Sequence, residues 1–508
     1  MESRTKNAQR NFIYVIVFQV VNIIVKFAMR TVFIYCLGKQ YLGINGVFTN
    51  VLTILSMTEL GLGSAIVYDL YKPLKENDQV KIAQQIMYFK KIYYCIGSII
   101  FVVGLLLIPF LPYILTDVPN VEHITLIYVL YLFNTASSYF FAQYSTLISA
   151  AQKNYLITKV QLSFSIIKSV VESVFLVITR NYLIYLLIEI ILNIISNSVI
   201  KNKALKEFPY LREKVEPLSK DNKKSVWNNA INASSMKLAG TLIDSTDNLI
   251  ISTIISTIVV GIYSNYYLII SIIQSTTFMI EKAVIAGVGD LCASEEDNGN
   301  KQRVFSNLQF IYAMLYAIIF SELIVNFQSF ITIWVGEGYL LSYPVVFVIV
   351  LNNYFVGIQQ PIETFMYSNG LFKYFKITPW IEAVMNLVIS VILAKQIGLI
   401  GVLLGTTISR LVVSFWYRAY VVFKYSLHYE YKNYWKKLIM YLAVTVFISC
   451  ICLIIKKCLT TILNNIWITL SISLIITLGI SIGVWLLFFG RTNEYKYSKA
   501  LIKRKKND

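Results

Sequence analysis

The chain is divided into long apolar runs, and the length of these runs is the strongest constraint on its fold. Fourteen of them, roughly 17–28 residues each, follow one another along the 508 residues. A helix rises 1.5 Å per residue, so about 20 apolar residues cross the hydrocarbon core of a bilayer. Charged residues make up only 14% of the chain, whereas soluble domains carry roughly 25%. The sequence therefore predicts an all-α integral membrane protein with about 14 transmembrane helices.

The first apolar run begins directly after a short basic segment, in the manner of a signal peptide. It is too long for the apolar region of a signal peptide, and no A-x-A cleavage pattern follows it. We therefore expect it to be retained as the first span. The predicted spans are residues 11–36, 44–68, 86–112, 122–150, 160–179, 182–201, 227–253, 258–281, 304–333, 341–368, 379–395, 398–423, 437–457 and 464–490.

The basic residues indicate which side of the membrane each connection faces. Most of the 45 Lys and Arg residues fall in alternate connections, beginning with the N-terminal segment and ending with the segment 491–506. Because cytoplasmic loops carry the excess of Lys and Arg, both termini are expected in the cytoplasm. The exceptions in the intervening loops are Lys39, Arg180, Lys395, Lys456 and Lys457. The net charge of +18 is thus explained by orientation and by contact with anionic membrane lipids, without a nucleic-acid partner.

A charged segment at residues 202–226 separates the spans into two groups, and a weak internal repeat relates these groups. The sequence around Gly43 resembles the sequence around Gly261, an offset of 218, and residues 153–158 resemble residues 373–378, an offset of 220. The repeat predicts two six-helix lobes related by a pseudo-two-fold axis along the membrane normal, plus two C-terminal helices. The expected domains are an N-lobe at 1–225, a C-lobe at 226–425, and spans 13–14 with a basic cytoplasmic tail at 426–508.

Local motifs resemble a known family. They are the segment from Thr58 to Ile66 (TELGLGSAI), the following Tyr71-Lys72-Pro73-Leu74, the turn from Leu42 to Gly46 and the loop from Ala151 to Tyr155. The chain resembles the Wzx-type polysaccharide-unit flippases, whose superfamily also holds the multidrug exporters and the lipid II flippase. The resemblance covers the whole chain in helix number and layout.

The resemblance implies a transporter of the bacterial plasma (inner) membrane that moves an undecaprenyl-diphosphate-linked oligosaccharide to the outer leaflet by alternating access. Capsule, exopolysaccharide or O-antigen assembly is the implied process, in functional association with polymer-assembly proteins. The alternatives are a lipid II flippase or a cation-coupled drug antiporter. A membrane polysaccharide polymerase or a glycosyltransferase is less favoured, because such enzymes need a sizeable external loop and the predicted external loops are short. No catalytic residue, metal site or bound cofactor is predicted.

Basic side chains inside the predicted spans are the candidates for binding a diphosphate. A charge at bilayer depth is costly and usually faces a wet cavity or a partner. Lys26 and Arg30 are one helical turn apart on the first span, where an anion would relieve their mutual repulsion. The alternative is an ion pair with an acid such as Asp244. Lys237 and Arg410 are the candidates from the second lobe, and local pairing or snorkelling is the alternative for them.

Acidic and amide side chains inside the spans are the candidates for a coupling ion, either Na⁺ or H⁺. Asp244 and Asp247 share a face of span 7, and Glu363 follows a helix-kinking proline in span 10. Glu382 and Asn386 are one turn apart on span 11, and oxygen ligands suit a hard cation such as Na⁺. Glu382 is also close to the start of its span, where an acid simply favours the helix dipole. Lys168 and Glu172, four residues apart on span 5, are expected to pair with each other.

Overall fold

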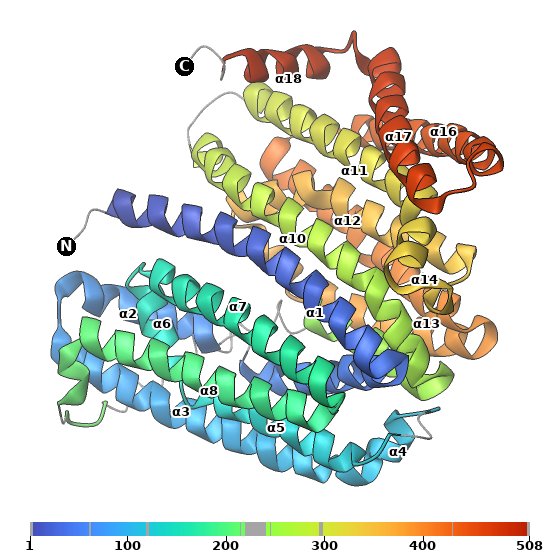
Figure 1. Ribbon diagram of the computed structural model, residues 1–508. Helices are drawn as coiled ribbons and strands as arrows, with labels where there is room; N and C mark the ends of the chain where they lie inside the picture. The colour runs from blue at the N-terminus through green and yellow to red at the C-terminus, as the bar shows by residue number, and fades with distance from the viewer. Residues whose placement is uncertain are drawn as a thin grey trace. The chain divides into compact units, whose positions relative to one another are not determined.

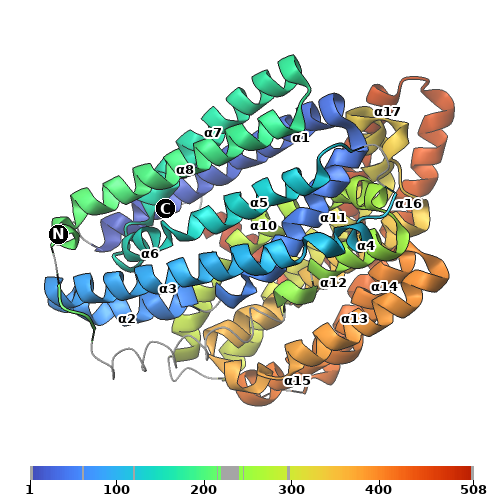
Figure 2. The same ribbon diagram turned by 90° about the horizontal axis from the view of Figure 1, so that it is seen from below.

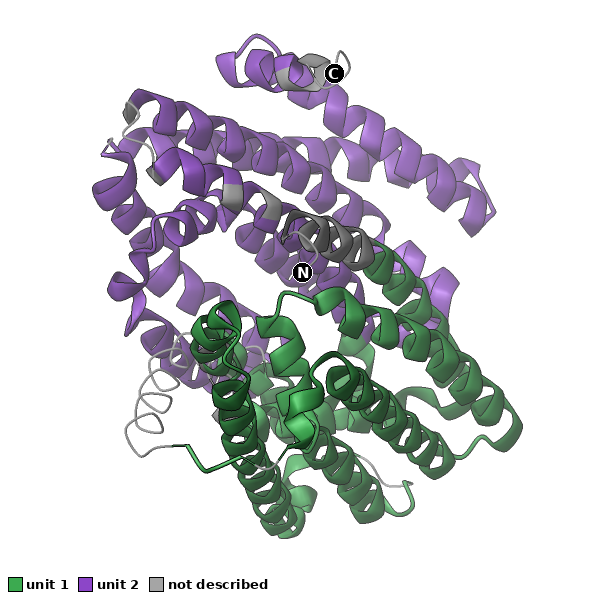
Figure 3. Cartoon of the chain, turned by 90° about the vertical axis from the view of Figure 1, so that its left-hand side faces the viewer, with its two compact units in different colours: residues 1–264 green, residues 265–508 purple. Residues whose placement is uncertain are grey.

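The computed structural model describes residues 4–59, 62–117, 121–213, 215–218, 240–243, 245–293, 298–428 and 430–504. These residues form helices joined by short connections and no strand, and they divide into two compact units, residues 1–264 and 265–508 (Figure 3). The boundary falls inside a long helix. The predicted lobe boundary at 225/226 lies outside the described residues and stays a prediction.

The first unit contains a long helix α1 followed by helices that pack lengthwise against each other (Figures 1 and 2). Helix α7 lies between α1 and α8, and α3 lies beside α5. The elements are α1 (Arg4–Leu55), η1 (Ser56–Glu59), α2 (Leu62–Glu76), α3 (Gln79–Leu106), η2 (Ile108–Phe110), α4 (Leu111–Ile114), α5 (Ile124–Tyr139), α6 (Ala142–Ala150), α7 (Asn154–Thr179), α8 (Tyr182–Glu207), η3 (Pro209–Arg212) and the π-helical turn η4 (Ile251–Ile255), followed by α10 (Thr257–Ala293), which runs into the second unit.

The second unit is arranged around α11, which contacts α12, α16, α17 and α18. Helices α13 and α14 form a hairpin beside α12 (Figure 2). The elements are α11 (Asn298–Val335), η5 (Glu337–Tyr339), α12 (Tyr343–Ser368), η6 (Leu371–Phe375), α13 (Thr378–Ile397), α14 (Leu399–Ser409), η7 (Arg410–Phe415), α15 (Trp416–Val422), η8 (Phe423–Leu427), α16 (Lys432–Ile462), α17 (Ile466–Phe489) and α18 (Asn493–Arg504). Of these, η7 and η8 are π-helical.

The helices account for the predicted spans. Within the described residues, 11 helices are long and apolar enough to cross a membrane, or 12 if the pair α5 and α6, bent by 43°, counts as one span. The first of the 11, Val17–Leu55, covers most of the predicted span 11–36 and the first half of the predicted span 44–68, with a kink between them at Gly38, whose φ is 78°. The described residues in the second half of the span 44–68 fall in η1 and α2, so this span is not one continuous helix. One further predicted span, 227–253, lies largely outside the described residues. The chain is an all-α, multi-pass membrane protein.

Helix α17 shows the distribution of side chains that a bilayer requires. Its buried face carries a hydroxyl on every fourth residue, whereas its outer face carries large apolar side chains such as Ile475, 73% exposed, and Leu487, 84% exposed. Exposure of this kind is unfavourable in water but matches lipid tails. The buried hydroxyl residues are Thr469, Ser473, Thr477 and Ser481.

Two boundaries differ from the sequence prediction. Lys456 was expected in an external loop, but α16 continues to Ile462 and Lys456 is only 9% exposed. Its ammonium group donates to Asn326 on α11 (3.4 Å), so the predicted loop position is wrong. In addition, the segment expected as a basic tail forms the amphipathic helix α18, which packs on α11.

Gly43 and Gly261 lie where α1 and the start of α10 cross in direct backbone contact. A methyl group on Gly43 would overlap the carbonyl of Thr257, and one on Gly261 would lie 2.5 Å from the carbonyl of Lys39. The two contacts are equivalent, because Lys39 and Thr257 are separated by the same 218 residues as the glycines. Such reciprocity is typical of two segments related by a local two-fold axis. It explains physically why the repeat retains glycine at both positions.

We expect Gly43→Ala and Gly261→Ala each to lower the thermal stability of the purified protein in detergent. The added methyl meets rigid backbone, which cannot move aside as a flexible side chain would. Gly479→Ala in α17 is the matched control, since nothing lies within 4 Å of a Cβ there. Replacing glycine by alanine within a helix should itself stabilise by about 0.5–1 kcal/mol. The control variant should therefore melt at a higher temperature than the wild type, and the two crossing variants at a lower one. Equal melting temperatures for the three variants would contradict the close crossing.

Candidate functional site: charged side chains within the spans

Arg30 on α1 is half-buried among neutral hydroxyl groups in the first unit. Its Nη2 donates to the carbonyl of Ser264 (3.2 Å). The guanidinium also lies within electrostatic range of the hydroxyls of Tyr131, Tyr182 and Tyr185. The bond to Ser264 uses one of five N–H donors, and no carboxylate of the described residues forms an ion pair with Arg30. The guanidinium therefore keeps donors for an anionic ligand.

The tyrosines around Arg30 are themselves held in place by hydrogen bonds. The hydroxyls of Tyr131 and Tyr182 are 2.6 Å apart, and Asn45 donates to Tyr131 (2.6 Å). The rings of Tyr182 and Tyr185 stack with centroids 5.8 Å apart. This network joins α1, α5 and α8 and fixes a polar surface beside the guanidinium.

The other predicted basic residues of the first unit differ from Arg30. Lys26 is exposed, so the two neighbouring cations do not share one environment. Lys237 and Asp244, the latter proposed as a partner of Lys26 or Arg30, lie outside the described residues. Asp247 is described and is buried, 8% exposed.

Lys168 on α7 joins a second polar cluster of the first unit. Its ammonium group is 2.9 Å from Glu189 on α8 and 3.9 Å from Glu172. The predicted pair of Lys168 with Glu172 is confirmed, and Glu189 is an additional, closer partner. Spacing along one helix could not reveal a partner from the adjacent helix.

The structure brings together three of the predicted residues of the second unit. Glu382 on α13 and Arg410 at the start of η7 form an ion pair (3.9 Å). Asn386, one turn after Glu382, donates through Nδ2 to Thr406 on α14 (2.9 Å), while its Oδ1 is buried without a hydrogen-bond donor in the described part of the chain. Two oxygen-bearing side chains and a cation therefore share the interface of the α13–α14 hairpin.

Glu363 on α12 forms an ion pair with Arg418 on α15. Next to this pair lies Glu281 on α10, which the sequence analysis did not select. Glu281 is 1% exposed, and neither of its carboxylate oxygens has a hydrogen-bond partner among the described residues. Its carboxyl group interacts electrostatically with Glu363 and approaches Thr364. Two carboxylates thus lie close enough to repel each other, and of the two only Glu363 has an ion pair in the described part of the chain, an arrangement that favours uptake of a proton or a cation.

The sequence does not single out Glu281 as a buried acid, because it is the last residue of the predicted span 258–281 and is followed by Lys282. This position is typical of a charge at the water boundary. However, α10 continues to Ala293, three further turns, and Glu281 packs inside the unit. The polar residues at 274–277 indicated the buried face, since Gln274 bonds Asn353 (3.2 Å) and Thr277 bonds Tyr316 (2.9 Å).

Comparison with solved structures identifies the architecture. A structure of the lipid II flippase MurJ in an inward closed conformation aligns with 96% of this chain and 100% of its own, with a TM-score of 0.64 and 16% identity. An inward-facing multidrug resistance MATE family transporter of the MOP superfamily covers 79% of this chain and 94% of its own, with a TM-score of 0.58 and 13% identity. The chain has the fold of the MOP-superfamily transporters.

A third structure with this fold is that of the MATE multidrug transporter DinF-BH. It aligns with 82% of this chain and 96% of its own, with a TM-score of 0.56 and 16% identity. No protein-family model matches the chain, and no curated protein matches its sequence. The predicted superfamily fold is confirmed, and the Wzx-type branch stays a prediction.

We expect Glu382→Gln to lower the thermal stability of the protein and Arg410→Gln to partly restore it in the double variant. Removing one member of a buried ion pair leaves the other charge uncompensated and typically lowers the free energy of unfolding by about 3–5 kcal/mol. Removing both members leaves no such charge, so the double variant should lose less stability. A double-mutant cycle in detergent measures this coupling. Strictly additive shifts would mean that the two side chains do not pair.

Proposed function

We propose that the chain moves a lipid-linked oligosaccharide, carried on undecaprenyl diphosphate, from the cytoplasmic to the outer leaflet of a bacterial plasma membrane. The cytoplasmic position of both termini and the association with polymer-assembly proteins belong to this proposal. Alternating access is the proposed mechanism, as the MOP-superfamily fold suggests. Products of this kind supply capsule, exopolysaccharide or O-antigen assembly.

The observation that carries the proposal is the half-buried Arg30. A cation within a span costs about 2.5–3.5 kcal/mol on insertion scales, and no acid of the described residues compensates this cost at Arg30. A diphosphate accepts hydrogen bonds from a guanidinium in a forked geometry and neutralises its charge. A cationic drug would be repelled at the same position.

The neutral environment of Arg30 also suits a substrate that must leave again. An ion pair with a fixed carboxylate would compete with the diphosphate, whereas tyrosine hydroxyls orient the guanidinium without neutralising it. Tyrosine rings near the cation offer apolar faces on which a sugar or an isoprenoid can pack. Exposed Lys26, one turn away, would attract the anion before it reaches Arg30.

The second unit supplies candidates for coupling. The Glu281 carboxylate, beside Glu363 and outside the Glu363–Arg418 ion pair, would accept a proton or Na⁺ at one stage of the cycle. Glu382 with Asn386 forms a second set of oxygen ligands, and buried Asp247 is a third candidate. Glu281 is the most deeply buried acid of these sets, at 1% exposed, and the described residues show no ion pair for it.

We expect Arg30→Ala to reduce transport about tenfold or more, since a charged hydrogen bond contributes about 1.5–3 kcal/mol. Arg30→Lys should retain part of the activity, because it keeps the charge but loses the fork. The measurement is the arrival of a fluorescently labelled undecaprenyl-diphosphate oligosaccharide in the outer leaflet of reconstituted vesicles. Arg212→Ala, an exposed arginine of η3, is the matched control.

The same assay tests the substrate class. Transport of lipid II in place of the oligosaccharide carrier would assign the chain to peptidoglycan precursors. Export of a cationic dye by the wild type, without movement of either lipid, would refute the proposal. Equal transport by Arg30→Ala and the wild type would remove Arg30 from the substrate path.

We expect Glu281→Gln to uncouple transport from an imposed proton or sodium gradient. The amide has nearly the shape of the acid but does not ionise, so it cannot exchange a proton and offers Na⁺ only a neutral oxygen. Stimulation by each gradient is measured in vesicles, with Glu337→Gln, an exposed acid of η5, as the control. Full stimulation of the Glu281→Gln variant would exclude this residue from coupling.

A further inference from the structure

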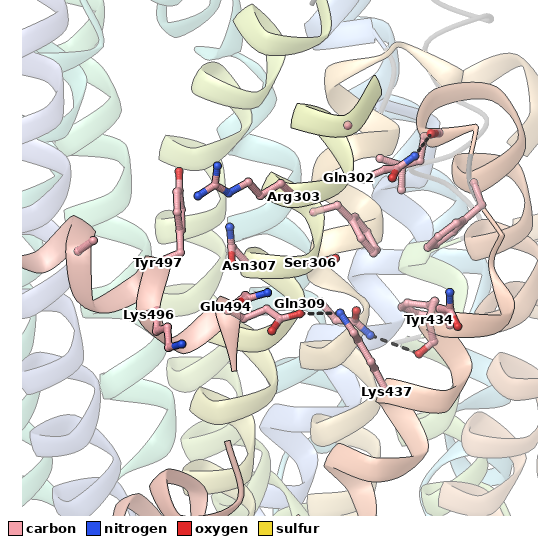
Figure 4. Close-up of a pocket in the computed structure, with 17 residues that line it drawn as sticks. Gln302, Arg303, Ser306, Asn307, Gln309, Tyr434, Lys437, Glu494, Lys496 and Tyr497 are labelled. Carbon is pink, nitrogen blue, oxygen red and sulfur yellow. Dashed lines mark hydrogen bonds and ion pairs between the residues drawn. The ribbon is translucent and has the colours of Figure 1, made fainter. Parts of the chain in front are cut away.

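A pocket of about 600 Å³ lies in the second unit where α11, α16 and α18 begin (Figure 4). Residues from the first three turns of α11, from the first two turns of α16 and from α18 form its walls, and the end of η8 closes one side. None of the residues proposed for transport lines it. The pocket therefore needs an explanation of its own.

Positive charge predominates in the pocket. Arg303, Lys437 and Lys496 line it, against a single acid, Glu494. Glu494 accepts a hydrogen bond from Lys437 (2.6 Å). Burial raises the pKa of the Glu494 carboxyl, but the hydrogen bond and charge of Lys437 outweigh burial and leave this pKa below its ordinary value. The acid is therefore ionised at neutral pH, and two positive charges remain in excess.

Two buried donors in the wall have no partner. The Nδ2 of Asn307 and the hydroxyl of Tyr434 form no hydrogen bond with any described residue, although the two side chains are only 4% and 2% exposed. Buried donors are normally paired. Both residues line the pocket, so its wall holds polar groups that no described residue satisfies.

Two backbone carbonyls at the wall accept hydrogen bonds from side-chain amides that also line it. Gln302 donates to the carbonyl of Leu427 (3.4 Å), and Gln309 donates to the carbonyl of Tyr434 (3.5 Å) (Figure 4). These carbonyls would otherwise repel an anion. The first turns of three helices add the positive ends of their dipoles to the same space.

We propose that this pocket binds a phosphate-bearing anion. Phosphate oxygens accept from several donors at once, which matches unpaired donors on two helices and the exposed ammonium group of Lys496 on a third. The pocket lies at the ends of the spans α11 and α16, where both a lipid headgroup and a soluble phosphate compound have access. Arg303, whose guanidinium lies over the ring of Tyr497 at 5.0 Å, is already oriented by α18.

The test is binding to the purified full-length protein in detergent, which requires no transport and is independent of the proposed function. Inorganic pyrophosphate is the soluble probe, measured by calorimetry. Dioctanoyl phosphatidylglycerol is the lipid probe, measured by native mass spectrometry, with dioctanoylglycerol as its uncharged counterpart. Binding of either phosphate probe supports the site, and which one binds identifies the source of the phosphate.

Two comparisons place the bound probe in the pocket. An exposed ionic contact contributes up to about 1 kcal/mol, so Lys496→Gln should weaken binding about threefold. Lys499 is on the same helix but outside the pocket, so Lys499→Gln should leave binding unchanged. Asn307→Asp keeps the shape of the side chain but replaces a donor by a negative charge, and it should weaken binding about tenfold or more.

Failure of the wild-type protein to bind either phosphate probe would overturn the proposal. Equal affinities of the Lys496→Gln and Lys499→Gln variants would also overturn it, because both remove one positive charge from α18. This lysine comparison changes no buried side chain, so it holds even where Asn307→Asp fails to fold.

Discussion

The cost of unpaired charge in hydrocarbon organises the polar interior of this protein. Lipid offers no hydrogen bonds, so a buried charge is retained where a second charge or a ligand compensates it. The described spans carry three such compensated pairs: Lys168 with Glu189, Glu363 with Arg418, and Glu382 with Arg410. Lys456 and Glu322 instead bond the side chain of Asn326, and Arg30 and Glu281 form no ion pair with any described residue.

These two residues divide the proposed work between the units. Arg30 would hold an anion that enters and leaves, so its surroundings are neutral hydroxyls. Glu281 would hold a small cation, and its surroundings include a second acid, Glu363. Each unit thus contains a charged side chain that forms no ion pair with a described residue. Under the proposed function, Arg30 would bind the transported lipid, and Glu281 would bind the ion whose gradient drives transport.

The sequence was informative about what a bilayer imposes directly. Apolar length predicted the spans, and the spacing of Glu382 and Asn386 placed these two side chains on one face of α13. Arg410 was predicted to bind a diphosphate, whereas its ion pair with Glu382 matches the local pairing named as the alternative. Partner choice across helices was not predictable, as Lys168 shows by pairing with Glu189. Glu281 and Lys456 were misjudged for one reason: apolar runs end before helices do, so a charge at the end of a run can still be buried. Helix α18 was missed because its apolar face is short and its composition is that of a tail.

The crossing of Gly43 and Gly261 limits how either position can change. Gly261 lies against the backbone of Gly43 itself, and a segment that contacts its own equivalent lies on a local two-fold axis. The two glycines are therefore two halves of one contact and not independent sites. A larger residue at either position separates the same two backbones, so a compensating change at the other position has no room to act.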